Sequence, residues 1–192
     1  MRRVFQGHLT NRRGFDDLIE TGTLTSNTAN IDIQFRDASY DSYEIRLNKV
    51  VPNQDDVIFQ IRTSVSAGFG FATDANYYYN FFNTATGGAG SLTATAASFI
   101  LGSRSSAGLD IGNASGEHAD YVFYVSSPAV ATEHTFIRFE GAYSQSNGNT
   151  DAIVAGAGRY LATQAVTAIR FFLNSGNFQR GTYEVIGHRN AV

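Results

Sequence analysis

The alternation of apolar and polar residues in short segments constrains the fold of this chain more than any other feature. Tyr43, Ile45 and Leu47 alternate with Glu44 and Arg46. Successive residues of a β-strand point to opposite faces of a sheet, so this pattern predicts a strand with one buried face and one solvated face. A helix would instead repeat its apolar residues every third or fourth position. We therefore expect β-structure here.

Segments with strand character recur along most of the chain. They are residues 18–24, 31–35, 43–47, 57–66, 99–102, 121–125, 135–143, 168–173 and 181–187. Turn signals separate them, with Asn147-Gly148 typical of a type I′ hairpin and Pro128 ending one segment. About eight to ten short strands at intervals of about 8–12 residues predict an all-β, single-domain antiparallel β-sandwich that is jelly-roll-like.

The first seventeen residues differ in charge from the rest of the chain. Residues 1–14 contain four arginines and no acidic residue. Chain termini are often poorly ordered unless a partner holds them. We interpret residues 1–17 as a basic arm and residues 18–192 as the sandwich domain. The arm is either a solvated tail or an assembly anchor, and the candidate anchor residues are Arg2, Arg3, Arg12 and Arg13.

Composition excludes several classes of protein. The chain has no cysteine, so disulfides, thiolate catalysis, iron–sulfur clusters and cysteine-ligated zinc are ruled out. The net charge of −3 argues against a basic nucleic-acid binder, and we expect no direct nucleic-acid partner. No apolar run is long enough for a membrane-spanning helix, and the first residues do not resemble a secretory signal.

Histidines and carboxylates do not form a recognisable catalytic or metal-binding pattern. None of the four histidines has the spacing of a metal-ligand pair, although a site from His118, Asp120 and His134 remains a minor alternative. The strand carboxylates alternate with apolar neighbours, as solvent-facing residues do, which argues against a glycosidase pair. These carboxylates are Asp32, Glu44, Glu140 and Glu184. We expect no catalytic residue, no metal and no cofactor, and therefore not an enzyme.

The densest aromatic segment lies between residues 69 and 79. Residues 77–82 are apolar at nearly every position, which indicates a central strand or a strand buried at a subunit contact. An aromatic ring also packs on the C–H face of a sugar, while amides and carboxylates bond its hydroxyls. The candidate residues for a glycan or subunit contact are therefore Phe69, Phe71, Asp74, Asn76, Tyr77, Tyr78 and Tyr79.

The basic residues are almost all arginine. Of the 14 lysines and arginines only Lys49 is a lysine. Arginine and tyrosine are enriched at protein interfaces, because a rigid guanidinium or ring buries area at low entropic cost. This composition fits either a subunit that assembles or a genomic preference for arginine.

Several segments together resemble a known family. They are residues 31–35, 40–47, 51–52, 59–62, 169–178 and 181–187. This arrangement resembles the jelly-roll virion structural proteins of tailed bacteriophages, prophages and gene transfer agents. The serine-glycine-asparagine turn at Ser175-Gly176-Asn177 and the following Gly181-Thr182 match the family's last strands, whereas Ile186-Gly187 replaces its terminal tyrosine-glycine.

The resemblance implies a role in a particle. Family members look like fibre, spike, baseplate or capsid-decorating subunits, commonly homotrimers, and share no catalytic motif. We therefore expect a non-enzymatic, bacteriophage-like virion structural protein: a head or tail decoration, spike or fibre subunit. It would sit in the virion, assembled in the host cytoplasm, bind other virion proteins, and contact the host surface and its polysaccharide. The alternative is a carbohydrate-binding module for a cell-surface glycan, and a polysaccharide-cleaving enzyme is a distant third.

Overall fold

The computed structural model describes residues 15–25, 27–35, 39–66, 69–74, 76–84, 90–96, 98–100, 110–148 and 151–189. These residues form two antiparallel sheets, which confirms the predicted β-sandwich. The described part contains twelve strands rather than about eight to ten. Their bounds are β1 (Phe15–Leu24), β2 (Asn30–Gln34), β3 (Ser42–Pro52), β4 (Phe59–Ser64), β5 (Tyr77–Asn83), β6 (Gly90–Ala96), β7 (Phe99–Ile100), β8 (Ala119–Ser126), β9 (Phe136–Ser144), β10 (Asp151–Tyr160), β11 (Ala168–Leu173) and β12 (Phe178–Arg189).

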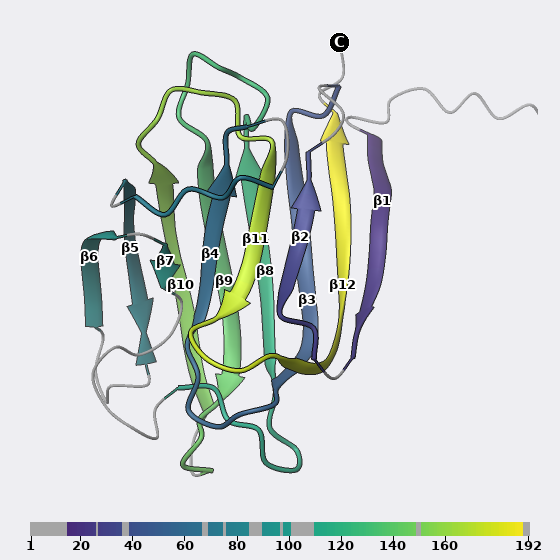
Figure 1. Cartoon of the computed structure of the whole chain (residues 1–192), viewed down its shortest axis with the longest axis vertical. Coiled ribbons are helices and arrows are strands. Elements are labelled where there is room, and N and C mark those ends of the chain that lie inside the picture. Colours follow the sequence, from purple (N-terminus) through teal and green to yellow (C-terminus); the bar gives the residue numbers. More distant parts are fainter. Residues whose placement is uncertain are drawn as a thin grey trace, which may run out of the picture.

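The strand order is that of a jelly roll. The large sheet has the order β1-β12-β3-β8-β9-β10-β5-β6, and the small sheet has the order β2-β11-β4-β7. The antiparallel pairs are nested: β5 pairs with β6, β4 with β7, β3 with β8 and β2 with β11. Figure 1 shows β2, β11 and β4 in front of strands of the large sheet. Such nested pairing wraps one long hairpin into two packed sheets.

Aromatic rings from both sheets fill the space between them. Phe59 of β4 and Phe171 of β11 come from the small sheet, and Tyr121 and Phe123 of β8 from the large sheet. All four side chains are buried. The ring centroid of Phe59 lies 5.1 Å from that of Tyr121 and 6.2 Å from that of Phe123. Burial of these large rings accounts for much of the apolar area that stabilises the sandwich.

Segment 77–82 is a strand inside the large sheet. β5 lies between β10 and β6, and its residues alternate between buried and exposed. Tyr77, Tyr79 and Phe81 point into the core, whereas Tyr78 and Phe82 are exposed on the outer face. The inward-facing aromatics of β5 therefore belong to the core, whereas its outward-facing aromatics form part of the protein surface.

The amino-terminal boundary differs slightly from the prediction. β1 begins at Phe15 and pairs with β12, so residues 15–17 belong to the large sheet and not to an arm. The candidate anchor residues Arg2, Arg3, Arg12 and Arg13 lie outside the described residues.

Candidate functional site

The aromatic segment 69–79 does not form one platform. The rings of Tyr77 and Tyr79 are fully buried, so the prediction that they contact a glycan or a second subunit is wrong for these two residues. The Tyr77 hydroxyl accepts a hydrogen bond from the Thr63 backbone N–H at 2.8 Å. Burial raises the pKa of Tyr77. Both tyrosines serve the core because strand alternation turns every second residue inward.

The aromatics of this segment that are exposed or half-buried lie on opposite sides of the sandwich. Phe71 forms a bridge to Ser64 of β4 and lies under the Arg170 guanidinium, 4.2 Å from the ring centroid, on the outer side of the small sheet. Phe69 stacks on Phe71 at 5.9 Å. Tyr78 projects from the outer face of the large sheet. A single ligand on the described surface therefore does not meet all of these rings.

The two polar candidates of the segment are bonded to each other. Asn76 donates to the Asp74 carboxylate at 2.6 Å, and the Tyr160 hydroxyl donates to the same carboxylate at 2.9 Å. Burial and the neighbouring Asp74 carboxylate raise the pKa of Tyr160 to about 12. The Asp74 carboxylate thus links Tyr160, the last residue of β10, to the loop that precedes β5.

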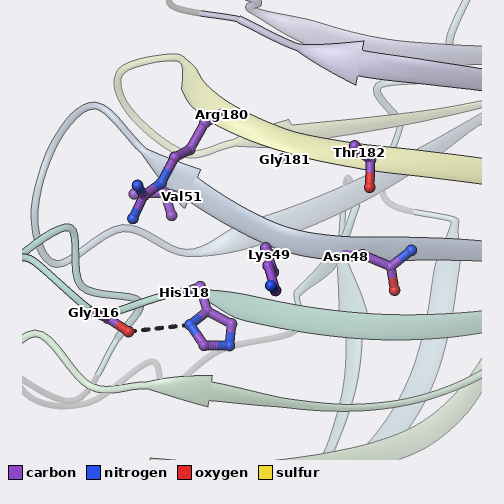
Figure 2. A pocket seen from close by; sticks show the side chains of 8 residues that line it. All are labelled: Asn48, Lys49, Val51, Gly116, His118, Arg180, Gly181 and Thr182. Carbon is purple, nitrogen blue, oxygen red and sulfur yellow. Dashed lines mark hydrogen bonds between the residues drawn. The ribbon is translucent and has the colours of Figure 1, made fainter.

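A hollow of about 430 Å³ lies on the outer face of the large sheet, where β12, β3 and β8 run side by side. We call it the bulge pocket. Figure 2 shows Lys49 of β3 between Arg180 of β12 and His118, which immediately precedes β8. The residues that line it are Asn48, Lys49, Val51, Gly116, His118, Arg180, Gly181 and Thr182.

An irregularity in strand pairing shapes the bulge pocket. The register of β3 against β8 shifts between Leu47 and Val50, so the intervening residues form a bulge. Lys49 has a φ of 51°, in the left-handed region that residues with a Cβ seldom adopt. Its backbone N–H donates to Asp120 Oδ1 at 2.7 Å, which satisfies the group that the bulge removes from the ladder.

Asp120 also holds His118. The His118 Nε2 lies 3.2 Å from Asp120 Oδ2, and its Nδ1 lies 3.1 Å from the Gly116 carbonyl oxygen. Each carboxylate oxygen of Asp120 therefore has its own partner, one on the bulge and one on the imidazole. This arrangement fixes the ring of His118 at the wall of the pocket.

Gly181 lets β12 approach the bulge. It has a φ of 140°, and a Cβ at this position would lie 3.0 Å from the Cα of Val50. Only glycine combines this backbone angle with so close an approach. The sequence contained the residues of the pocket, but the shifted register that gathers them is a property of three paired strands and has no local signal.

The minor alternative of a metal site is not supported by the positions of its residues. His118 precedes the first residue of β8, and His134 precedes the first residue of β9. Because Ala119 pairs with Tyr143 and Ser126 with Phe136, these two positions lie at opposite ends of the β8–β9 hairpin. Among the described residues, no group of three or more histidine or carboxylate side chains is placed to hold a metal ion.

The carboxylates considered for catalysis are mostly paired with arginine. Asp32 forms a bidentate pair with Arg170 at 2.7 and 2.6 Å. Arg46 lies 2.6 Å from Glu44 and 3.8 Å from Glu184. Asp32 lies in the small sheet and Glu44 and Glu184 in the large sheet, so the tertiary structure separates these candidates.

A second feature of the large sheet is an exposed apolar patch, which we call the outer patch. Its four large side chains come from three adjacent strands and are 40–59% exposed: Tyr78 and Phe82 of β5, Phe136 of β9 and Ile153 of β10. Between them a hollow of about 530 Å³ lies over Ala155, Gly156 and Ala157. Arg138 and Glu140 of β9 line the same hollow.

Arginines lie over aromatic rings on both faces of the sandwich. Their guanidinium carbons are 4.1–5.7 Å from the ring centroids, within the range of a cation–π contact. The pairs are Arg62 with Phe172, Arg138 with Tyr124, Arg159 with Phe136, Arg170 with Phe71 and Arg189 with Tyr40. The arginine-rich composition therefore has a structural counterpart, since these stacks stiffen side chains that remain partly exposed.

Comparison with known proteins adds no family. No protein-family model matches the chain, and no curated protein matches it. Within the described residues no helix is long and apolar enough to span a membrane.

Proposed function

We propose that this protein is a non-enzymatic structural subunit of a bacteriophage-like virion, a head or tail decoration, spike or fibre subunit that assembles with copies of itself. The observation that carries the proposal is the outer patch. Large apolar side chains gathered on one face usually mark a protein interface, since exposing them to water is unfavourable.

The shape of the outer patch suits a second copy of the same chain. Phe82 of β5 and Ile153 of β10 project, while the small Ala155, two residues after Ile153 on β10, lies directly opposite Phe82 in the pairing of β10 with β5. A symmetric contact needs projecting and receiving groups on the same molecule. Here both lie on one face of the large sheet.

The charges of the outer patch support the same occupant. Arg138 and Glu140 are two residues apart on β9, both are exposed, and neither forms an ion pair within the described part of the chain. A second copy offers a carboxylate for Arg138 and a guanidinium for Glu140. Such pairs align two surfaces even where they add little affinity.

The particle itself is supported by the family resemblance and by the jelly-roll order of the strands. A virion subunit needs rigidity and contact area, which a sandwich with stacked arginines provides. The resemblance favours a homotrimer that also contacts other virion proteins, and the basic residues of the arm would anchor it. Localisation in the virion follows from the same proposal.

A carbohydrate-binding module is the second candidate. The observation in its favour is the exposed group on the small sheet, where Phe69 stacks on Phe71 beside the paired Arg170 and Asp32. An aromatic ring with neighbouring polar groups is the usual chemistry for a sugar. The two candidates use opposite faces of the sandwich and are therefore separable.

The solution mass tests the proposal. We expect the wild-type chain to form a closed oligomer by light scattering, and Ile153→Glu and Phe82→Glu to convert it to monomers because they place charge in the contact. Leu18→Glu is the matched control. Leu18 is 63% exposed on β1, the strand at the edge of the large sheet away from the outer patch, so this substitution should leave the mass unchanged. A wild-type monomer would overturn self-assembly.

The place of the protein on a particle needs a second measurement. Particles sedimented from its native source should contain the chain in the particle fraction by mass spectrometry. Absence from that fraction, together with binding to a glycan array that Phe69→Ala abolishes, would replace the virion proposal with the carbohydrate-binding module.

A further inference from the structure

We propose that the bulge pocket is a binding site for an oxyanion, the carboxylate or phosphate group of a ligand. This inference is independent of self-assembly, because the pocket lies over β12, β3 and the residues just before β8, whereas the outer patch lies over β9, β10 and β5.

Most of the surface inside the bulge pocket is apolar, and the titratable side chains among its lining residues are all basic. Lys49, Arg180 and His118 contribute to it, and no aspartate or glutamate does. Figure 2 shows Lys49 of β3 above His118, the residue just before β8, with Arg180 of β12 extending toward Val51. Lysine supplies three donors and arginine five, so the pocket has more donors than acceptors. An oxyanion complements this excess.

Asp120 does not cancel the charge of the pocket. It lines the smaller neighbouring hollow of about 140 Å³ and not the bulge pocket itself. Its two oxygens are occupied by the Lys49 backbone N–H and by His118. Asp120 is therefore a positioning residue: it offsets one positive charge, but it also holds the bulge and the imidazole in place.

The bulge turns Lys49, the only lysine of the chain, away from the regular strand ladder. A lysine in a regular strand has a neighbour on each side, whereas a bulged residue is turned away from the ladder. Strained backbone at a residue other than glycine persists where the surrounding structure enforces it. At Lys49 the enforcing contact is the hydrogen bond to Asp120. The result presents an ammonium group at the rim of the hollow.

Neutral donors complete the pocket. The Asn48 amide and the Thr182 hydroxyl lie opposite each other in the pairing of β3 with β12, and both line the hollow. The volume of about 430 Å³ accommodates a phosphate or a single acidic sugar. The ligand class is thus a compact oxyanion with hydroxyl neighbours, either a uronic acid or a phosphate ester.

The single lysine makes the test direct. Protein produced with isotope-labelled lysine gives one set of lysine side-chain signals in an NMR spectrum, and these signals come from Lys49. We would titrate with inorganic phosphate and with glucuronate at constant ionic strength, because salt screens exposed charges. Glucose is the neutral control. A saturable shift with phosphate or with glucuronate supports the site and names the source of the oxyanion.

Two variants assign any binding to the pocket. Arg180→Gln should weaken binding about tenfold, as expected for loss of one charged hydrogen-bonding group. Arg62→Gln, at an arginine of β4 in the small sheet that belongs neither to the bulge pocket nor to the outer patch, should leave the affinity unchanged. Absence of a saturable shift with both anions, or equal affinity in wild type and Arg180→Gln, would overturn the proposal. Light scattering of Lys49→Met reports separately on self-assembly, which should persist.

Discussion

Removal of the Phe59 ring should destabilise the sandwich strongly, because this ring is fully buried. Its ring lies between the sheets, with centroid distances of 5.1 Å to Tyr121, 6.2 Å to Phe123, 5.8 Å to Phe171 and 6.0 Å to Phe178. Phe59→Ala removes a fully buried ring and leaves a cavity that four rigid neighbours cannot refill. A substitution of this kind lowers the free energy of unfolding by about 3–5 kcal/mol.

That loss is a large part of the total stability of a domain, about 5–15 kcal/mol. We expect the urea midpoint of Phe59→Ala to fall with little change in slope, and its melting temperature to fall by about 10–15 °C. Both measurements are made at one protein concentration, since self-association adds apparent stability.

Phe69→Ala is the matched control. Phe69 has the same side chain but is 48% exposed, so the substitution should change the free energy of unfolding by less than about 1 kcal/mol. A loss below about 1 kcal/mol for Phe59→Ala, or equal losses for both variants, would refute the view that rings between the two sheets stabilise the fold.

Two further predictions concern alkaline pH and the bulge. Burial raises the pKa of Tyr143 to about 12, against about 10 in the unfolded chain. The buried neutral hydroxyl therefore contributes fully to the free energy of unfolding below pH 10, and this contribution is lost between pH 10 and 12, where only the unfolded chain ionises. Measured by urea denaturation between pH 10 and 12, the free energy of unfolding of Tyr143→Phe should fall by about 2–3 kcal/mol less than that of wild type. An equal fall in both proteins would contradict this prediction. In the same assay, Gly181→Ala should lower the free energy of unfolding by about 2 kcal/mol and Gly116→Ala by about 1 kcal/mol. Both glycines have a positive φ, but only at Gly181 would the added Cβ contact neighbouring backbone atoms. Equal losses would contradict the steric argument.

Strand β10 shows the limit of reading alternation from sequence. Its residues Asp151–Tyr160 include three alanines and two glycines, which carry little strand signal. The strand forms because β9 and β5 pair with it on both sides. Gly156 fits there because a Cβ would lie 2.6 Å from the Asn80 carbonyl oxygen. The neighbours, not the segment's own preferences, decide this strand.

For the candidate sites too, the sequence showed which residues are present, and only the structure showed where they lie. The aromatic content of residues 69–79 was plain from sequence, but the structure buries Tyr77 and Tyr79 and places Phe69 and Tyr78 on opposite sides. Lys49 was visible only as the one lysine of the chain. Its place beside His118 and Arg180 depends on a bulge that exists only relative to two neighbouring strands.

The sequence by itself determined the β class, the antiparallel sandwich and most strand positions, because the two-residue period is local and each strand carries it independently. Only the tertiary structure decided which strands are neighbours, which aromatic residues remain exposed and where basic side chains converge. These depend on pairing between residues far apart in the chain, and a shift of register by one residue exchanges the buried and exposed faces of a strand.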